Sequence, residues 1–359
     1  MASYPLPVKT KCSEGRDAAS IWLEIPKDLT QAFTYRAGQF ITIEAEIAGE
    51  TLMRQYSLSS SPGRDDSLRI TVKKIPDGRV SSWLVDDIGE GELLEVATPR
   101  GVFFRPPETA CHVLLLAVGS GVAPMIPIAR ALLDSKLRHK ITFACGNRSE
   151  TDIMLRGDID ALAAHPDVTV EHVISRDESW PGARGRIDRA YLQAQLPAWT
   201  ERCGSPMLAY LCGPEAFMDA AESALMCFGL DRNNIRMESF DLVLNDEDDG
   251  EALPLTCDNP GEAGPCETIT AVVTGEEIEV VPEEGETILD ALVRVDADVP
   301  FSCQEGTCSS CISKLTAGAA EVRPSVLKTL REDDLEEGLT LACLTRPTAR
   351  HVRIDFDEI

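Results

Sequence analysis

The sequence of 359 residues lacks long apolar runs and has few positive charges. It contains no stretch of 18 or more apolar residues, so we expect no transmembrane helix and no membrane partner. The first residues lack the basic start and apolar core of a signal peptide, which favours a cytoplasmic protein. There are 34 basic residues against 60 acidic ones, and the net charge of −26 argues against nucleic acid as a partner. Binding the phosphate backbone of a nucleic acid requires a basic surface.

Histidine gives no indication of a metal site, whereas cysteine does. No ligand spacing links the five histidines: His112, His139, His165, His172 and His351. Of the 12 cysteines, three follow the spacing C-x4-C-x2-C and a fourth lies further along the chain. This is the plant-type ferredoxin pattern, in which four thiolates hold a 2Fe-2S cluster and carry single electrons. The predicted metal ligands are Cys303, Cys308, Cys311 and Cys343.

Two alternatives for these cysteines are a zinc site and disulfide bonds. Zinc motifs usually bring cysteines in two close pairs, whereas here a triplet is followed by a single residue. Disulfides are disfavoured because nothing in the chain indicates secretion. Gly306, inside the triplet, would let the backbone bend closely around a cluster.

The chain is long enough for two or three separate cores. Residues 241–267 are rich in acidic residues, proline and glycine and show no apolar periodicity, which predicts a flexible linker. Within residues 1–107, short alternating runs between Gly and Pro turns predict an antiparallel β-barrel. Within 108–240, buried strands alternate with helices, which predicts a doubly wound parallel sheet. Residues 268–359 hold the cysteine pattern and form the last predicted domain.

Two small-residue turns follow apolar strands in the predicted parallel sheet. Gly119, Gly121 and Pro124 lie where a strand passes into a helix, a place that suits a nucleotide pyrophosphate. The turn lacks the third glycine of the dinucleotide fingerprint, so a plain tight turn is the alternative. A second such turn begins at Cys212 and Gly213. Two turns at the carboxyl ends of strands in one sheet predict a shared crevice.

The barrel carries two polar sites. Arg54, Tyr56 and Ser57 place a guanidinium, a phenol and a hydroxyl on one strand, which suits a phosphate and a flat ring. A solvated strand with one core tyrosine is the alternative. Further on, Gly78 begins a helix that carries Ser81, which predicts an anion site.

In chain order, the motifs R-x-Y-S, G-x-x-S-x-x-L, G-S-G-x-A-P and C-G-P resemble those of the ferredoxin-NADP reductase superfamily. With the ferredoxin module, the chain resembles the single-chain reductases of bacterial oxygenases, such as those of phenylacetyl-CoA epoxidase, ketosteroid 9-alpha-hydroxylase and glycine betaine demethylase systems. The resemblance implies a multidomain protein with an antiparallel β-barrel flavin domain, an α/β doubly wound nucleotide domain and an α+β β-grasp ferredoxin domain.

The resemblance also implies a place for each cofactor. The flavin ring would contact Arg54, Tyr56 and Ser57, and Phe240 could cover it. Leu58 and Val72 are further expected cofactor-binding residues. The flavin pyrophosphate would bind at Gly78, Val80, Ser81 and Ser82. The nicotinamide dinucleotide would bind at Gly119, Gly121, Pro124, Ser175, Arg176, Cys212, Gly213 and Pro214. Ser57, which could tune the flavin N5, and Cys212, near the nicotinamide, would be the catalytic residues.

The G-x-x-S-x-x-L run and the domain order imply FAD rather than FMN. Ser175 and Arg176, with Arg184 or Arg186, lie where NADPH-preferring relatives bind the 2′-phosphate. An arginine there could also be a solvated loop residue, so NADH stays open and NADPH is only slightly favoured.

These parts predict an NAD(P)H-dependent flavin iron-sulfur oxidoreductase. Nicotinamide delivers two electrons at once and the cluster accepts one, so the flavin is the required converter. We expect a monomer that is the reductase component of a bacterial oxygenase, with a separate Rieske or di-iron component as the acceptor. The alternatives are a stand-alone NAD(P)H diaphorase or quinone reductase, and a non-enzymatic redox-sensing or scaffolding protein.

Overall fold

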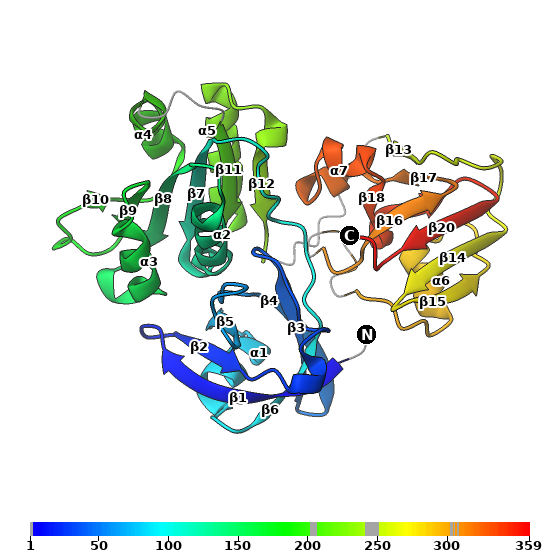
Figure 1. The fold of residues 1–359 in the computed structure, drawn as a ribbon, viewed down its shortest axis with the longest axis horizontal. Coiled ribbons are helices and arrows are strands. Elements are labelled where there is room, and N and C mark those ends of the chain that lie inside the picture. The colour runs from blue at the N-terminus through cyan, green and yellow to red at the C-terminus, as the bar shows by residue number, and fades with distance from the viewer. Residues whose placement is uncertain (1–2, 202–206, 241–250, 302–303, 305, 307–308) are drawn as a thin grey trace. The chain divides into compact units, whose positions relative to one another are not determined.

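The computed structural model describes residues 3–201, 207–240, 251–301, 304, 306 and 309–359. The chain divides into two compact units, and among the described residues these run from Ser3 to Glu238 and from Ser239 to Ile359. The first unit contains a barrel and a parallel sheet, and the second contains a mixed sheet with a smaller sheet beside it (Figure 1).

The barrel is an antiparallel sheet of six strands in the order β4-β3-β6-β1-β2-β5. The strands are β1 (Ser3–Ser13), β2 (Ala18–Leu23), β3 (Phe40–Ile47), β4 (Glu50–Ser57), β5 (Leu68–Lys73) and β6 (Leu93–Ala97). An antiparallel bridge joins Leu58, directly after β4, to Ile70 of β5 and so links the two end strands. Alternate residues such as Ile41 and Ile43 are fully buried. The sheet therefore curls into the predicted barrel with its core inside.

A short helical segment packs against the barrel after β5. It consists of α1 (Arg79–Ser82) and a π-helical turn, η2 (Trp83–Asp87). Val80 and Leu84 belong to the barrel core, so this segment is held by buried apolar contacts.

The second half of the first unit is an entirely parallel sheet with the order β10-β9-β8-β7-β11-β12. Its strands are β7 (His112–Val118), β8 (Lys140–Asn147), β9 (Val168–Ile174), β10 (Ala183–Arg184), β11 (Met207–Cys212) and β12 (Ile235–Glu238). Its helices are α2 (Val122–Asp134), α3 (Arg156–Ala163), α4 (Arg189–Glu201) and α5 (Glu215–Phe228).

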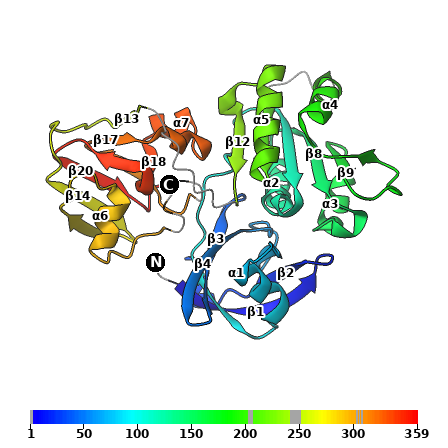
Figure 2. The same cartoon turned by 180° about the vertical axis from the view of Figure 1, so that it is seen from behind.

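The helices cover both faces of this sheet. Val113 and Leu115 of β7 pack in one apolar cluster with residues of α2 and α3. Leu114 and Leu116 pack on the other face with residues of α4 and α5. The alternation follows from the two-residue period of a strand, and the continuous apolar run of β7 matches a strand buried on both faces. Figure 2 shows α2 and α5 on either side of the central strands.

The strand order reverses between β7 and β11, which lie side by side although α2, β8, α3, β9 and α4 separate them in the chain. In an open parallel sheet, ligands bind at such a reversal, outside the carboxyl ends of the strands. Both turns singled out in the sequence lie here, directly after β7 and β11.

The second unit contains a mixed sheet in the order β15-β14-β20-β16-β18, in which β14 and β20 are parallel. Its strands are β14 (Thr268–Val273), β15 (Glu276–Val280), β16 (Ile312–Ala317), β18 (Leu339–Leu341) and β20 (His351–Asp355). The helices are α6 (Ile288–Arg294) and α7 (Glu332–Glu336). Helix α6 begins with a capping box between Thr287 and Asp290. This is the predicted β-grasp arrangement of a mixed sheet and a packed helix.

The structure differs from the expected linker in its second part. Strand β13 (Leu253–Thr256) pairs with β17 (Ala319–Val322), which in turn pairs with β19 (Thr345–Pro347). Leu255 is 1% exposed, and a bridge joins Ala263 to Ala349. The expectation of a flexible linker is therefore wrong for residues 253–256 and for Ala263. The physical reason is that Leu253 and Leu255 supply an alternating apolar pair that the surrounding Pro, Gly and acidic residues obscure.

Candidate functional site

The end of β4 brings the predicted flavin residues to the parallel sheet. Ser57 is 4% exposed, and its Oγ donates a hydrogen bond of 2.7 Å to Oε2 of Glu238, the last residue of β12. Burial raises the pKa of Glu238 to about 7, against the opposing effect of the Ser57 bond. A group that titrates near neutral pH therefore lies in direct contact with the predicted catalytic serine.

Glu238 is a site residue that sequence reasoning missed. It stands 181 residues from Ser57, and only the order of the strands brings the two together. Cys212 is its register partner on β11, and the Glu238 charge contributes to raising the pKa of the Cys212 thiol. Ser57, Cys212 and Glu238 thus converge at the carboxyl ends of β11 and β12.

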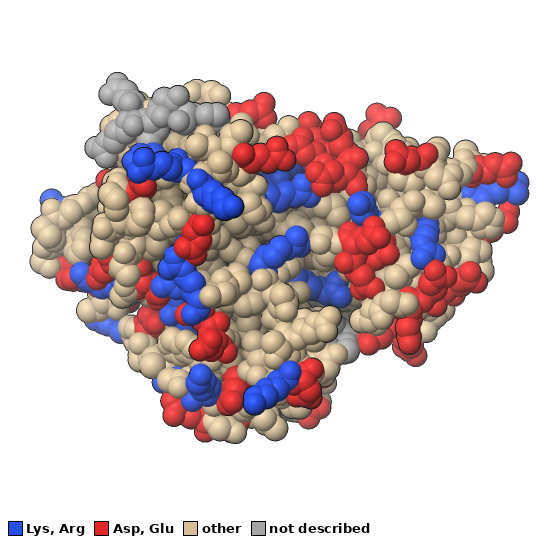
Figure 3. Space-filling view, in the orientation of Figure 1, with Lys and Arg blue, Asp and Glu red and all other residues tan. Residues whose placement is uncertain are grey.

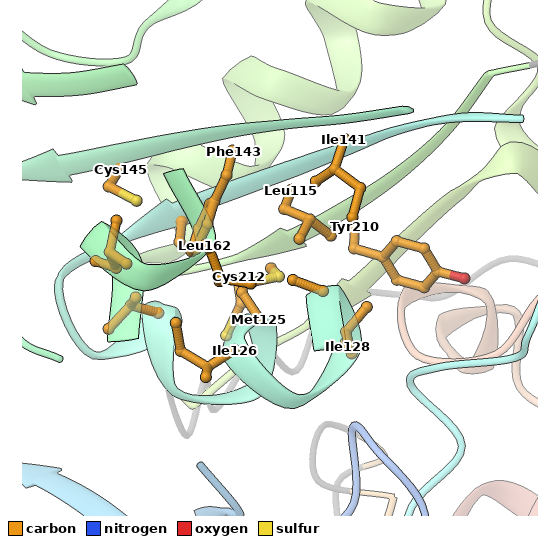
Figure 4. Packing of buried hydrophobic residues seen from close by; sticks show 14 of the residues in the cluster. Leu115, Met125, Ile126, Ile128, Ile141, Phe143, Cys145, Leu162, Tyr210 and Cys212 are labelled. Carbon is orange, nitrogen blue, oxygen red and sulfur yellow. The ribbon is translucent and has the colours of Figure 1, made fainter. Parts of the chain in front are cut away.

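The Cys212 side chain is fully buried in an apolar cluster with Met125 and Tyr210 (Figure 4). Burial, more than the nearby Glu238 charge, raises the pKa of its thiol well above the usual value. The thiol is therefore neutral, and a catalytic role for Cys212 stays a prediction. Its carbonyl has a clearer structural role, because a Cβ at Gly121 would lie 2.0 Å from the Cys212 oxygen. Glycine at 121 is required for the two turns to meet.

Arg54 and Tyr56 lie on β4 with Ser57, Leu58 follows that strand directly, and Val72 lies on β5. Arg54 is exposed, and its Nη1 donates to the Met53 carbonyl. Tyr56 is partly buried against the barrel core, and burial raises the pKa of its phenol. Leu58 and Val72 are buried in the same core. An accessible guanidinium beside a partly buried phenol fits an aromatic ring with a charged or polar edge.

Gly78 begins the short helix as predicted, but the Ser81 hydroxyl is already engaged. Its Oγ donates to the Gly78 carbonyl at 3.1 Å and accepts a bond from the Ile75 amide at 3.3 Å. A Cβ at Gly78 would lie 2.3 Å from Ile75. Val80 is buried and Ser82 is partly exposed. Ser81 therefore shapes this turn, and pyrophosphate binding here stays a prediction.

A second residue that sequence reasoning missed, Lys73 at the end of β5, lies beside the turn after β7. Gly119 has φ +59°, and a Cβ on it would lie 3.7 Å from the Lys73 Nζ. Burial, followed by the nearby Arg148 charge, lowers the pKa of Lys73. Pro124 stands in the first turn of α2, where its missing N–H costs no helical bond. An ammonium beside a glycine turn and a helix start fits a dinucleotide pyrophosphate.

Ser175 and Arg176 lie beside Asn147 and Arg148 at the carboxyl ends of β8 and β9. The Ser175 amide donates to the Asn147 carbonyl at 3.0 Å, and the Arg176 amide donates to the Arg148 carbonyl at 2.7 Å. The Arg148 charge lies close enough to Lys73, the last residue of barrel strand β5, to help lower the pKa of its ammonium. Lys73 beside the Gly119 turn, with the Arg148 charge near it, suits an anionic dinucleotide.

The second unit brings the remaining predicted residues. Cys311 is 2% exposed and Cys343 5%, and their Sγ atoms lie 3.3 Å apart. This separation exceeds the roughly 2.05 Å of a disulfide and suits two thiolates on one iron. Cys303 and Cys308 lie outside the described residues. Phe240 is 42% exposed, and its contact with a flavin stays a prediction.

Gly306 lies close to the segment that supplies Cys343. Gly306 has φ +80°, and a Cβ on it would lie 2.2 Å from Leu344, next to Cys343. Thr329 donates to the Gly306 carbonyl at 2.6 Å. Gly306 therefore packs closely on the segment that supplies the fourth cysteine, and the described residues fit a 2Fe-2S cluster.

Comparison with known families agrees with this division. Residues 5–104 match the oxidoreductase FAD-binding domain, residues 115–223 the oxidoreductase NAD-binding domain and residues 271–348 the 2Fe-2S iron-sulfur cluster binding domain. The protein is therefore an NAD(P)H-dependent flavin iron-sulfur oxidoreductase with FAD and a 2Fe-2S cluster as cofactors.

Curated relatives define the family more closely. The chain is 33% identical over 359 residues to the 3-ketosteroid-9-alpha-monooxygenase ferredoxin reductase component of Rhodococcus rhodochrous, covering 99% of this chain and 97% of the relative. It is 31% identical to one polypeptide of the 1,2-phenylacetyl-CoA epoxidase from Escherichia coli, covering 99% and 98%. Solved phthalate dioxygenase reductase is 26% identical with a TM-score of 0.54, covering 99% and 98%. The chain belongs to the family of reductase components of multicomponent oxygenases.

Among the described residues, no helix combines the length and the apolar character needed to cross a bilayer.

Proposed function

We propose that this reductase passes electrons from NAD(P)H to a separate oxygenase component with a Rieske or di-iron centre. The observation that carries the proposal is the Ser57–Glu238 contact at the strand-order reversal, in one chain with the paired thiols of Cys311 and Cys343. When bound, a flavin accepts an electron pair from nicotinamide and releases electrons singly.

The side chains have separate tasks in this proposal. Arg54 and Tyr56 bind the flavin ring, and Gly78 to Ser82 bind its pyrophosphate. Lys73 and the turn at Gly119 bind the dinucleotide pyrophosphate. Ser57 orients the flavin edge toward the nicotinamide. Glu238 holds Ser57 in place by accepting a hydrogen bond from the Ser57 hydroxyl.

The acidic character of the chain favours a basic acceptor. Residues 251–359 contain 23 acidic and 8 basic residues, a net charge of −15 out of −26 for the whole chain. Figure 3 shows Asp and Glu side chains gathered over this second unit on the face in view. Complementary charge speeds the encounter of electron-transfer partners, so we expect reduction of the acceptor to slow at high salt.

We further propose domain limits at 1–107, 108–240 and 268–359, a monomeric state, and a cytoplasmic location where NAD(P)H is supplied. Size-exclusion chromatography with light scattering tests the monomer, and a mass of twice the chain would refute it.

The functional test measures how fast the purified protein, supplied with NADPH or with NADH, reduces two different electron acceptors. We expect an oxygenase component encoded near this chain to be reduced at least about tenfold faster than a soluble quinone, since complementary docking accelerates association. Faster reduction of quinone would instead identify a diaphorase. Absence of flavin absorption bands from the purified protein would contradict both assignments.

A further inference from the structure

A largely buried charge network joins the barrel to helices α2 and α3 of the parallel sheet. Its centre is Asp158 in the first turn of α3. Asp158 Oδ2 accepts a bond of 2.9 Å from Arg69 of the barrel, and Oδ1 accepts one from Arg130 of α2. The side chains of Arg69, Asp158 and Arg130 are 9%, 16% and 18% exposed. One carboxylate therefore bridges two guanidiniums from different parts of the unit.

The barrel fixes Arg69 independently of Asp158. Its Nε donates to the Ser59 hydroxyl at 3.1 Å and its Nη2 to the Ser59 carbonyl at 2.7 Å. The guanidinium also lies 5.4 Å from the centre of the Trp22 ring. These contacts leave the Arg69 Nη1 aimed at Asp158, so the barrel presents a preoriented donor to α3.

Arg130 makes the return connection from α2 to the barrel. Its Nη1 donates to the Ser61 hydroxyl at 3.0 Å and lies 3.7 Å from Asp65 Oδ2. The network thus contains two guanidiniums and two carboxylates, Asp65 and Asp158. The charges balance, with Asp65, whose side chain is 39% exposed, at the more exposed end of the network.

A further contact holds the start of α3 to the barrel. Leu155 precedes α3 with φ +54°, a conformation that is costly for a residue other than glycine. Its amide donates to Glu14 Oε2 of the β1–β2 hairpin at 2.8 Å. The barrel therefore stabilises the strained residue from which the Asp158 helix begins.

The elements joined by this network also carry the proposed cofactor residues. Ser59 and Ser61 follow Ser57 by two and four residues, and α2 begins at the Gly119–Gly121 turn. We infer that Asp158 is a positioning residue that holds the barrel and the parallel sheet at the separation required for the Ser57–Glu238 contact and for electron transfer from nicotinamide to flavin. This inference rests on the proposed site residues.

Replacing Asp158 leaves two guanidiniums facing each other without their shared carboxylate. They repel, and the two halves of the unit separate or rotate slightly. A misplacement of about 1 Å at reacting atoms costs about 100-fold in rate. We therefore expect the rate of electron transfer from nicotinamide to flavin to change more than the affinity for the dinucleotide. The proposed dinucleotide-binding residues lie mostly on the parallel-sheet side of the unit.

The test uses full-length, flavin-loaded Asp158→Asn, with Asp160→Asn as the matched control. Asp160 lies on the same helix, its side chain is 63% exposed, and one of its carboxylate oxygens lies 3.8 Å from Arg156 Nε. In stopped flow, we expect the limiting rate of flavin reduction by NADPH to fall about 10- to 100-fold in Asp158→Asn. The dissociation constant for NADP⁺ should change by less than about threefold, since a positioning role alters rate more than binding. The control should match the unsubstituted protein in both quantities.

A second readout does not depend on activity. Hydrogen–deuterium exchange should increase in Asp158→Asn both around Leu155 and in barrel residues 59–65, but not in Asp160→Asn. An unchanged limiting rate per bound flavin, or unchanged exchange in residues 59–65, would overturn the inference. If Asp158→Asn yields too little folded protein, Arg130→Gln carries the same expectations. Failure of the unsubstituted protein to bind flavin would instead refute the proposed function, so the two failures are distinguishable.

Discussion

Glu238→Gln tests the electrostatic account of the site. Glutamine keeps an oxygen that can accept the Ser57 bond but does not titrate. In the folded protein the pKa of Glu238 is raised from 4.5 to about 7. The folded state therefore holds this proton more tightly than the unfolded chain. The stability that this preference contributes is complete below pH 4.5 and is lost as the pH rises through 7.

The expected magnitude follows from the pKa values. Each pKa unit corresponds to about 1.36 kcal/mol, so ionising Glu238 costs the folded state about 3 kcal/mol by pH 8. Glu238→Gln does not incur this cost. Between pH 4.5 and pH 8, the free energy of unfolding should therefore shift by about 3 kcal/mol in favour of Glu238→Gln relative to the unsubstituted protein.

The sequence provides a selective probe for this measurement. All four tryptophans, Trp22, Trp83, Trp180 and Trp199, lie in the first unit. Urea unfolding followed by tryptophan fluorescence therefore reports the unit that contains Glu238. The exposed Glu108 gives a matched control, Glu108→Gln, which should show no such shift. If the difference in the free energy of unfolding between Glu238→Gln and the unsubstituted protein did not change with pH, that result would refute the reasoning. A higher free energy of unfolding for the unsubstituted protein at pH 8 would also refute it.

Three further predictions concern other parts of the chain. Cys343→Ala removes one of two adjacent buried thiols, so electron delivery to a protein acceptor should fall below about 1% while ferricyanide reduction stays within about twofold; equal loss of both would contradict separate electron-transfer stages. Lys73→Met removes the ammonium beside Gly119 and should raise the KM for NADPH about tenfold with kcat nearly unchanged, which steady-state kinetics would check; an unchanged KM would exclude this role. Burial lowers the pKa of His112 to about 4, so the stability that its neutral form provides is present above pH 6.5 and is lost as the pH falls towards 4. Relative to His112→Gln, the first unit should therefore lose about 3 kcal/mol by pH 4 in the tryptophan unfolding assay, and parallel pH profiles would refute this.

The domains and the cluster ligands could be predicted from the sequence because their signals are local motifs with fixed spacing. The C-x4-C-x2-C pattern, the glycine turn after an apolar strand and the alternating barrel strands are all encoded within a dozen residues. Cys311 and Cys343 lie together in the structure as their predicted shared role requires.

The residues that sequence reasoning missed depend on contacts between distant segments. Glu238 meets Ser57 only because β12 lies beside β11 at the strand-order reversal. Asp158 meets Arg69 across 89 residues. A single sequence indicates neither pair, since both depend on how the barrel packs against the parallel sheet. Lys73 had no distinct local signal, because apolar and polar residues alternate along its strand, and only the structure brings it to Gly119.

The linker prediction failed for a different reason. The charge and the Pro/Gly content of residues 241–267 dominate the pattern of this segment, and the alternation in β13 covers only four residues. Short strands with two apolar residues carry little signal in such a window.

The central claim is that one chain stores electrons on both a flavin and an iron-sulfur cluster. An anaerobic titration of the purified full-length protein with a strong chemical reductant, followed by absorbance, tests it most directly. The account predicts about three electrons per chain, two bleaching the flavin bands and one bleaching the cluster bands. Uptake of only two electrons, with no cluster absorption in a freshly isolated protein, would contradict it.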